Sequence, residues 1–483
     1  MTEKIKQTLR DSKTARWVAL GIVSFTMLTG YLFQEIISPL KPMLESQLGW
    51  TSSDFGIVTG AYGVFNVVLL MLIVVGVLLD KLGIRFSAIT AALIMLVGAA
   101  IKFYAIKYGD PDALLNIFGW QVKTQVVIAF AGFGIFGIGV EYAGITVSKI
   151  IVKWFKGKEM ALAMGLEMAS ARLGSFGALA FSYMIAKNYS ISAPVGIGVL
   201  LLIIGLLAFI VYYMMDIKLD KQDYTGEEEE EEPFRLKDIV MIVTNKGFWY
   251  IAILCVLFYS AVFPFYKFGP DLMVNKFGID PSKAGMIPSL LPFGTLFLTP
   301  FFGNLYDRKG KGATIMMIGA LMLLLVHTVL WIPSLNSVYV AIVMVVILGI
   351  AFSLVPSAMW PSVPKIIPEK QLGTAYAMIF WVQNIGLSGV PMLLGFVLDK
   401  TNPETVTKIE EARMKFEAMG LDNGAIAEKM DELKAAGEIL PWDYETSWLI
   451  FIACALSAIV FAFLLKAEDK KKGYGLELPN IEK

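Results

Sequence analysis

Two ionisable residues lie in the middle of long apolar segments, where a charge is expensive. Glu141 lies in the stretch 124–152, and Arg172 lies in the stretch 159–186. A charged side chain at the centre of a bilayer costs ~2.5–3.5 kcal/mol on insertion scales. An acid and a base held apart at one depth suit a zwitterion, because the carboxylate can bind an ammonium and the guanidinium can grip a carboxylate. A structural ion pair between the two helices is the alternative explanation.

Other polar side chains lie at a similar depth in other apolar segments. They could line the same site, or they could hydrogen-bond neighbouring helices, as buried amides and hydroxyls in membrane spans usually do. The candidate substrate-binding residues are Asn66, Tyr259, Gln383 and Asn384, with Trp360 nearer one mouth of the site.

The residue types give no support to metal, cofactor or enzyme chemistry. One histidine and two cysteines predict no zinc site, and the zero net charge suggests no nucleic-acid partner. Gly132, Gly134 and Gly137 match a dinucleotide-binding pattern, but the apolar run continues to Val152 without a strand-to-helix break. We therefore expect these glycines to allow close helix packing, and we expect no catalytic residue, metal or cofactor.

The composition is that of a membrane protein. Of the 483 residues, 57% are hydrophobic and 17% are charged, and the mean hydropathy is +0.66. The apolar residues form blocks near the ~20 residues that span a bilayer as a helix. Helices are expected because a segment in lipid must satisfy its own backbone. The sequence predicts an all-α membrane protein with twelve transmembrane helices in two pseudo-symmetric six-helix bundles, near residues 17–40, 54–79, 86–106, 124–152, 159–186, 191–214, 247–268, 281–303, 312–333, 337–363, 371–398 and 446–466.

Polar inserts divide the chain. We expect an N-terminal bundle in residues 1–214, a linker in 215–246 and a C-terminal bundle in 247–483. The linker contains six consecutive glutamates, Glu227 to Glu232, which are typical of a solvated segment. A second insert, 400–445, has helical spacing of apolar residues and predicts two short helices that cap the outer face.

The distribution of basic residues favours cytoplasmic termini in a cell membrane. Twelve spans place both termini on one side, and the loops on that side are richer in lysine and arginine. The bias is weakened by Lys102, Lys107, Lys267 and Lys276, which we assign to outer loops.

A loop is repeated one half apart. Each copy has a glycine for close helix contact, an aspartate at the end of a span, a base, and a turn glycine. The aspartate could meet the positive end of a neighbouring helix, and its charge cluster could form and break as the halves move. The residues are Gly76, Asp80, Lys81 and Gly83 in the first copy, and Gly303, Asp307, Arg308 and Gly310 in the second.

This repeat resembles the signature loop of the major facilitator superfamily, which follows the second span and recurs after the eighth. The resemblance implies two six-helix halves that rock around a central site. Further segments, such as Gly165–Ser175 and Gln383–Leu387, resemble the lysosomal dipeptide transporter branch. That branch implies a facilitative carrier in which an acid on span four binds the peptide amine and an arginine on span five binds the carboxylate. Glu141 and Arg172 occupy the matching positions.

The outer insert and the glutamate run depart from the branch and suggest a prokaryotic relative. The expected function is transport of dipeptides by alternating access, and a monomer in the lipid bilayer is expected. Proton coupling is an open alternative, with Glu141, Glu167 and Glu35 as candidates. A carrier of organic anions or amino acids is the nearest other function, and a membrane sensor or scaffold is the alternative of another class.

Overall fold

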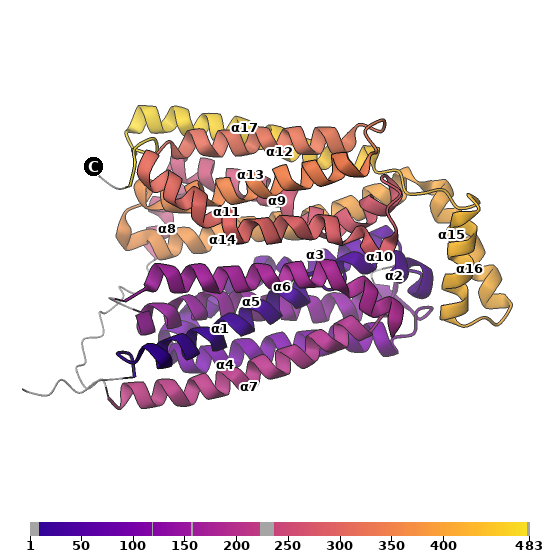
Figure 1. The fold of residues 1–483 in the computed structure, drawn as a ribbon, viewed down its shortest axis with the longest axis horizontal. Coiled ribbons are helices and arrows are strands. Elements are labelled where there is room, and N and C mark those ends of the chain that lie inside the picture. The colour runs from indigo at the N-terminus through magenta and orange to yellow at the C-terminus, as the bar shows by residue number, and fades with distance from the viewer. Residues whose placement is uncertain (1–8, 118, 156–157, 223–235, 481–483) are drawn as a thin grey trace, which may run out of the picture.

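Two bundles of long helices lie against each other along their length (Figure 1). The computed structural model describes residues 9–117, 119–155, 158–222 and 236–480. The long helices run between two ends of the molecule. We call the end with α8 and the described chain termini the terminus face, and the end with α2, α15 and α16 the insert face. The glutamate run Glu227 to Glu232 lies outside the described residues.

The N-terminal bundle is formed around α5, against which α3 and α4 pack. Its elements are α1 (Lys13–Glu35), η1 (Ser38–Leu40), α2 (Lys41–Leu48), α3 (Ser52–Val68), α4 (Met71–Tyr108), β1 (Leu114–Ile117), β2 (Trp120–Lys123), α5 (Thr124–Phe155), α6 (Met160–Asn188) and α7 (Ala193–Asp220).

The C-terminal bundle packs α9 against α14 and α17, and α13 against α11 and α12. Its elements are α8 (Leu236–Val243), α9 (Lys246–Asn275), α10 (Pro281–Ala284), α11 (Met286–Lys309), α12 (Gly312–Trp331), α13 (Val338–Ile366), η2 (Glu369–Gln371), α14 (Leu372–Thr401), α15 (Pro403–Ala418), α16 (Asn423–Ala435) and α17 (Glu445–Lys472). The two bundles meet mainly through α3 with α14 and α6 with α11.

The predicted all-α membrane fold is confirmed. Ten helical segments in the described part of the chain are long and apolar enough to cross a bilayer by themselves. The other two spans are α6, which carries Glu167 and Arg172, and a span made by α3 with the first turns of α4. Gly83 interrupts α4 with φ +75°, a conformation that glycine adopts without strain, so α4 serves two successive spans.

The second span is broken where the sequence predicts one continuous helix over 54–79. α3 ends at Val68, and Leu70 has φ +52°. In a straight helix the Val67 carbonyl would accept a hydrogen bond from the N–H of Met71. Here the indole N–H of Trp381, from α14, donates to that carbonyl at 3.0 Å. A side chain inserted into the backbone ladder is a recognised cause of a helix break.

The insert 400–445 forms the two short helices that its periodicity predicts, α15 and α16. Their apolar residues Ile409, Phe416, Ile426 and Met430 are buried. The antiparallel hairpin of β1 and β2 was not predicted; its residues lie in the connection between the predicted spans 86–106 and 124–152.

Glycines bring α3, α4 and α5 into close contact, as expected from their spacing. A Cβ at Gly137 would lie 2.0 Å from the Tyr62 carbonyl oxygen, and one at Gly132 would lie 2.6 Å from the Lys102 backbone nitrogen. At Gly134 the nearest atoms belong to the ring of Phe65, at 2.8 Å. The pattern Gly132–Gly137 therefore serves helix packing.

We predict that Gly137→Ala lowers the free energy of unfolding by about 1–3 kcal/mol, because the added methyl must push α5 away from the α3 backbone. Gly144→Ala on the same helix is the matched control, since its Cβ would lie 3.7 Å from Met27 in ordinary contact. Thermal unfolding in detergent measures both variants. Equal midpoints for the two would contradict the close contact at Gly137.

Candidate functional site

Glu141 and Arg172 lie at nearly the same depth in the N-terminal bundle. Glu141 lies on α5, which ends at the terminus face at Phe155, and Arg172 lies on α6, which begins at that face at Met160. Counted from those two helix ends, a rise of about 1.5 Å per residue places them about 21 Å and about 18 Å from the terminus face. Both also act electrostatically on the hydroxyl of Tyr31, from α1.

Two candidate residues of the C-terminal bundle lie at the same depth. Tyr259 lies on α9, which begins at the terminus face at Lys246, and Asn384 lies on α14, which begins there at Leu372. The same rise, counted from those two residues, places them about 20 Å and about 18 Å from the terminus face. Helices from both halves thus contribute polar groups to one central layer.

Glu141 lies where the two bundles meet. The Tyr62 hydroxyl on α3 donates to its Oε1 at 3.1 Å, and the Asn384 side chain on α14 lies near the same carboxyl group. Asn384 donates to the Phe380 carbonyl at 2.9 Å. Tyr62 was missed from the sequence, although it precedes Asn66 by one helical turn and therefore lies on the same face of the helix.

Arg172 has no ion-pair partner among the described residues, so the structure does not contain the Glu141–Arg172 pair that was the alternative explanation. Its guanidinium lies between two aromatic rings, with Cζ 4.9 Å from the Phe352 ring centre and 6.0 Å from that of Tyr31. Its Nη1 is buried and has no hydrogen-bond partner in the described part of the chain. A buried donor without an acceptor costs about 1–3 kcal/mol, more for a charged group. An incoming carboxylate would remove that cost.

An aromatic group lies between the central layer and the terminus face. The Trp360 indole donates to the Tyr259 hydroxyl at 3.2 Å. The Trp360 ring stacks on Phe380 with centres 4.9 Å apart, and its carbonyl accepts a hydrogen bond from Tyr376. Trp360 lies less than two turns before the end of α13 at Ile366, and its place at one mouth of the site stays a prediction.

Asn66 and Gln383 are buried but lie beside the central group rather than in it. Asn66 donates to the Tyr62 carbonyl at 3.5 Å, a long bond, and its Oδ1 has no partner within the described ranges. Gln383 accepts a weak hydrogen bond from the Cys255 thiol, with Sγ and Oε1 3.6 Å apart. Gln383 therefore faces α9 inside the C-terminal bundle.

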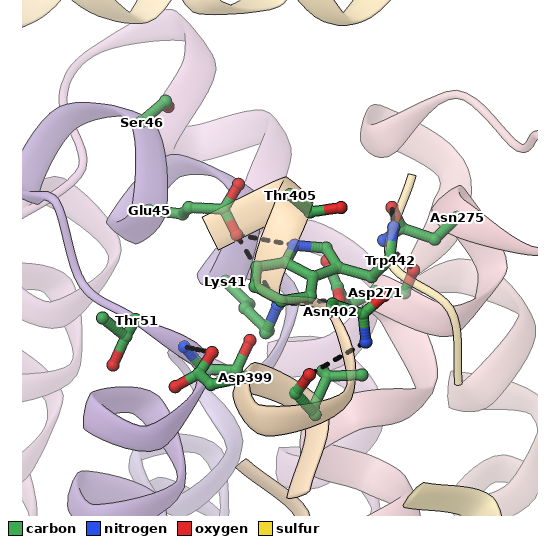
Figure 2. A network of polar contacts seen from close by, with 12 residues as sticks. Lys41, Glu45, Ser46, Thr51, Asp271, Asn275, Asp399, Asn402, Thr405 and Trp442 are labelled. Atoms are coloured by element: carbon green, nitrogen blue, oxygen red, sulfur yellow. Dashed lines mark hydrogen bonds and ion pairs between the residues drawn. The ribbon is translucent and has the colours of Figure 1, made fainter. Parts of the chain in front are cut away.

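A second polar cluster closes the insert face (Figure 2). Lys41, on α2, forms a buried ion pair with Asp271, on α9, at 2.9 Å, and the Tyr444 hydroxyl also donates to Asp271. Glu45 accepts hydrogen bonds at 2.8 Å from the Trp442 indole and from Lys434 of the insert. Each of these contacts joins the C-terminal bundle to the N-terminal one, apart from that of Tyr444.

The insert contributes charge to this closure. Burial alone would lower the pKa of Lys434, but the Glu45 carboxylate beside it more than offsets burial and raises that pKa. Asp399, at the end of α14, accepts the backbone N–H groups of Ser52 and Ser53 at 2.9 and 2.7 Å. A carboxylate at the positive N-terminal end of α3 is favourable.

Lys267 corrects one expectation from the sequence. It was assigned to an outer loop, but α9 continues to Asn275 and buries it. Its ammonium pairs with Glu35 of α1 at 2.7 Å and donates to the Gln34 carbonyl at 2.8 Å. Lys102 was assigned to an outer loop in the same way and is also fully buried, within α4.

The ion pairs between the two bundles in which both partners are described all lie toward the insert face. They are Lys41–Asp271, Glu35–Lys267, Glu45–Lys434 and Asp112–Arg413. The molecule is therefore closed at the insert face.

The repeated loops lie at the terminus face and make contacts inside their own bundles. Asp80 pairs with Lys149 of α5 at 2.6 Å, and the Asn480 side chain donates to Asp307 at 2.8 Å. Arg308 lies in the last turn of α11, and Gly310 has φ +67°, as a turn glycine allows. The expected close helix contact at Gly76 and Gly303 is wrong in this structure, where a Cβ at either would meet no heavy atom within 4 Å.

Comparisons with known proteins agree with this architecture. The Major Facilitator Superfamily profile matches residues 23–391. The lysosomal dipeptide transporter MFSD1 of Danio rerio is 30% identical over 395 residues, which are 80% of this chain and 81% of that protein. A galacturonate transporter of Dickeya chrysanthemi is 22% identical over 57% of this chain and 76% of its own length. A bacterial homologue of the human lysosomal transporter Spinster, inward-facing and unoccupied, superposes with a TM-score of 0.67 at 16% identity, covering 95% of this chain and 98% of that one.

We predict that Lys41→Met opens the insert face, because removing one partner of a buried ion pair costs about 3–5 kcal/mol. The readout is the labelling rate of Ser388→Cys, in a Cys454→Ala background, by a membrane-impermeant thiol reagent added at the insert face. Ser388 is buried where α14 meets Gly60 of α3, so opening exposes it.

Lys429→Met is the control for this measurement, because Lys429 forms an exposed pair with Glu432 in the insert. Exposed pairs contribute about 0–1 kcal/mol, so the labelling rate should not change. An unchanged rate in Lys41→Met as well would mean that the buried pair does not hold the face closed.

Proposed function

Because the chain belongs to the Major Facilitator Superfamily, we propose that this membrane transporter moves dipeptides across a bilayer by alternating access. Glu141 binds the peptide ammonium, and Arg172 binds the peptide carboxylate. A dipeptide is roughly 7 Å from end to end, at ~3.3–3.6 Å per extended residue. Two unpaired charges of opposite sign at one depth suit such a ligand.

The state of Arg172 is the observation that carries the proposal. Its guanidinium lies against Phe352 and Tyr31 with Nη1 unpartnered, so its planar fork is positioned in advance for a carboxylate. A structural arginine in an apolar span would instead be expected to pair, since an unpaired charge there is costly.

The surroundings of Glu141 support a site that is formed by both halves. The Glu141 carboxyl group accepts a hydrogen bond from Tyr62 in the N-terminal bundle and lies near the Asn384 side chain of the C-terminal bundle. A ligand ammonium at Glu141 would therefore compete with contacts that also join the halves. In this proposal Tyr259 and Trp360 wall the site toward the terminus face, while Asn66 and Gln383 support it from behind.

We infer that the repeated loops act as conformational switches at the terminus face. In the present state Asp80 and Asp307 each bind a partner within their own bundle. When the terminus face closes, each aspartate can exchange that partner for one in the opposite bundle. The division into 1–214, 215–246 and 247–483, with the cap 400–445, is proposed on the same basis of packing within bundles.

The terminus face is proposed to lie in the cytoplasm, in a cell membrane, with the chain acting as a monomer. The bias of basic residues supports this orientation. The loops of the insert face contain fewer basic residues than we assigned to them from the sequence. Lys102 and Lys267 are buried within spans and no longer count as outer-loop charges.

A carrier of organic anions is the second candidate, favoured by the similarity to a galacturonate transporter. In that case Arg172 would hold the carboxylate of the solute without a matching ammonium at Glu141. The two candidates differ in what they require of the acid, so substitution of Glu141 separates them.

We predict that Arg172→Ala lowers uptake of a labelled dipeptide into proteoliposomes by about 10-fold to 100-fold, because a charge-assisted hydrogen bond contributes ~1.5–3 kcal/mol. Ser170→Ala, on the same helix, is the matched control, since among the described residues the Ser170 hydroxyl bonds only the Leu166 carbonyl of its own helix. Normal uptake by folded Arg172→Ala would remove Arg172 from the site.

We predict that Glu141→Gln lowers dipeptide uptake by about the same factor as Arg172→Ala. The glutamine amide can still accept a hydrogen bond, but it lacks the charge that attracts an ammonium. The measurement compares a dipeptide, the corresponding free amino acid and galacturonate. Galacturonate uptake that survives Glu141→Gln, with no dipeptide uptake by the unaltered protein, would favour the anion carrier.

A further inference from the structure

Lys102 is a fully buried lysine that the proposed solute site does not use. It lies on α4, and among the residues that the structure describes its Nζ has no hydrogen-bond partner. The Nζ lies 3.6 Å from the centre of the Phe133 ring and 5.2 Å from that of Phe33. Gly132 of α5 packs against its backbone, so water has little room beside it.

A charged amine at this position would be poorly compensated. Contact with aromatic faces supplies about 2 kcal/mol for a desolvated cation, whereas burying an unpaired ion costs several kcal/mol. The charged groups that act on Lys102 are Glu35 of α1 and Lys267 of α9. Of the other helices that pack here, α5 presents the Phe133 ring, and α7 presents Gly198 against Phe33.

Glu35 is already taken in the closed state. Lys267 pairs with it at 2.7 Å, and the Ser38 hydroxyl donates to the same oxygen at 3.0 Å. Lys267 also lies 5.9 Å from the Phe133 ring centre, the same ring that the Lys102 amine contacts at 3.6 Å. The two amines are therefore neighbours around one ring. Two ammonium groups and one carboxylate there would leave an excess positive charge in an apolar site.

The two lysines belong to different halves. Glu35 and Lys102 lie in the N-terminal bundle, whereas Lys267 lies in the C-terminal bundle. Opening of the insert face must therefore withdraw Lys267 from Glu35 and leave the carboxylate in the same bundle as Lys102, on which it acts electrostatically. A buried carboxylate without its cation is unfavourable, and Lys102 is the cation within the same bundle that can replace Lys267.

We propose that Lys102 is a proton-binding site whose occupancy is set by the insert-face gate. With the face closed, Lys267 neutralises Glu35 and Lys102 is an uncharged amine. When the face opens, the Lys102 nitrogen takes one proton from the solution on that side and the resulting ammonium pairs with Glu35. Closure returns Lys267 to Glu35, and Lys102 releases the proton.

The exchange of partners fixes the sign of a pH effect. The open state binds one proton more than the closed state, so acid favours opening of the insert face and base favours closure. Within the range where the two states differ in protonation, the ratio of open to closed molecules changes up to about tenfold per pH unit. This proton site goes beyond the proposed function, since it concerns a coupling ion and holds for any solute.

The test measures the gate without substrate. Spin labels at Tyr189→Cys, at the end of α6, and Tyr339→Cys, in α13, report the separation of the halves at the insert face. Both native side chains are more than four-fifths exposed, so labels should be tolerated. Cys454→Ala removes the accessible native thiol, while Cys255 is buried. The distance distribution is recorded between about pH 5 and about pH 9, a range in which a buried amine can titrate.

The expected result is a longer-distance population that grows as the pH falls. Lys102→Met should keep the face closed and remove most of that growth. Lys107→Met, which replaces an exposed lysine on the same helix, should leave it unchanged. A pH-independent population in the parent, or full pH dependence in Lys102→Met, would overturn the proposal.

Lys267→Met provides an independent variant if Lys102→Met fails to fold. Without Lys267, Glu35 is free to pair with Lys102 in both states, so Lys102 stays charged and the pH dependence should be lost. Retained pH dependence in this variant would count against the exchange of partners. Because no solute is present, these results do not depend on whether dipeptides are transported, and failed dipeptide uptake would leave them unaffected.

Discussion

Buried ion pairs between the two bundles are the constraint on which the arrangement of this protein depends. Glu35–Lys267 and Lys41–Asp271 each join one residue from each half in surroundings from which water is excluded. Pairs of this kind are expensive to break and add little when intact, so they specify an arrangement more than they stabilise the fold. With the insert face fixed in this way, α3 packs on α14 and the polar groups of both halves meet at one depth.

The central layer divides its charges between different environments. Glu141 accepts a hydrogen bond from Tyr62 and lies near Asn384 of the other bundle, whereas Arg172 lies against two aromatic rings and its Nη1 has no acceptor among the described residues. The insert adds a third element to this design. It belongs to the C-terminal half, yet Lys434 and Trp442 reach Glu45 in the other half, so a segment outside the twelve helices takes part in closure.

The sequence predicts most of what depends on position along a single helix. The depth of Glu141 and Arg172 follows from counting residues in apolar segments, and the helices of the insert follow from periodicity. Features that depend on the neighbouring helix were missed. Lys267 was assigned to an outer loop although it lies at the end of the predicted span 247–268, because its pairing with Glu35 of another helix cannot be read from the sequence. The break at Leu70 was missed for the same reason, since its cause, Trp381, lies in the other half of the chain.

The hydrogen bond from Trp381 to Val67 has a consequence for how the second span behaves during transport. A lipid-embedded carbonyl cannot be left without a donor, because an unsatisfied backbone group there costs several kcal/mol. Any motion that draws α14 away from α3 must therefore either carry the indole along or return the Val67 carbonyl to the N–H of Met71. In the second case the broken span straightens. A rigid-body movement between the halves would then change the secondary structure within one helix.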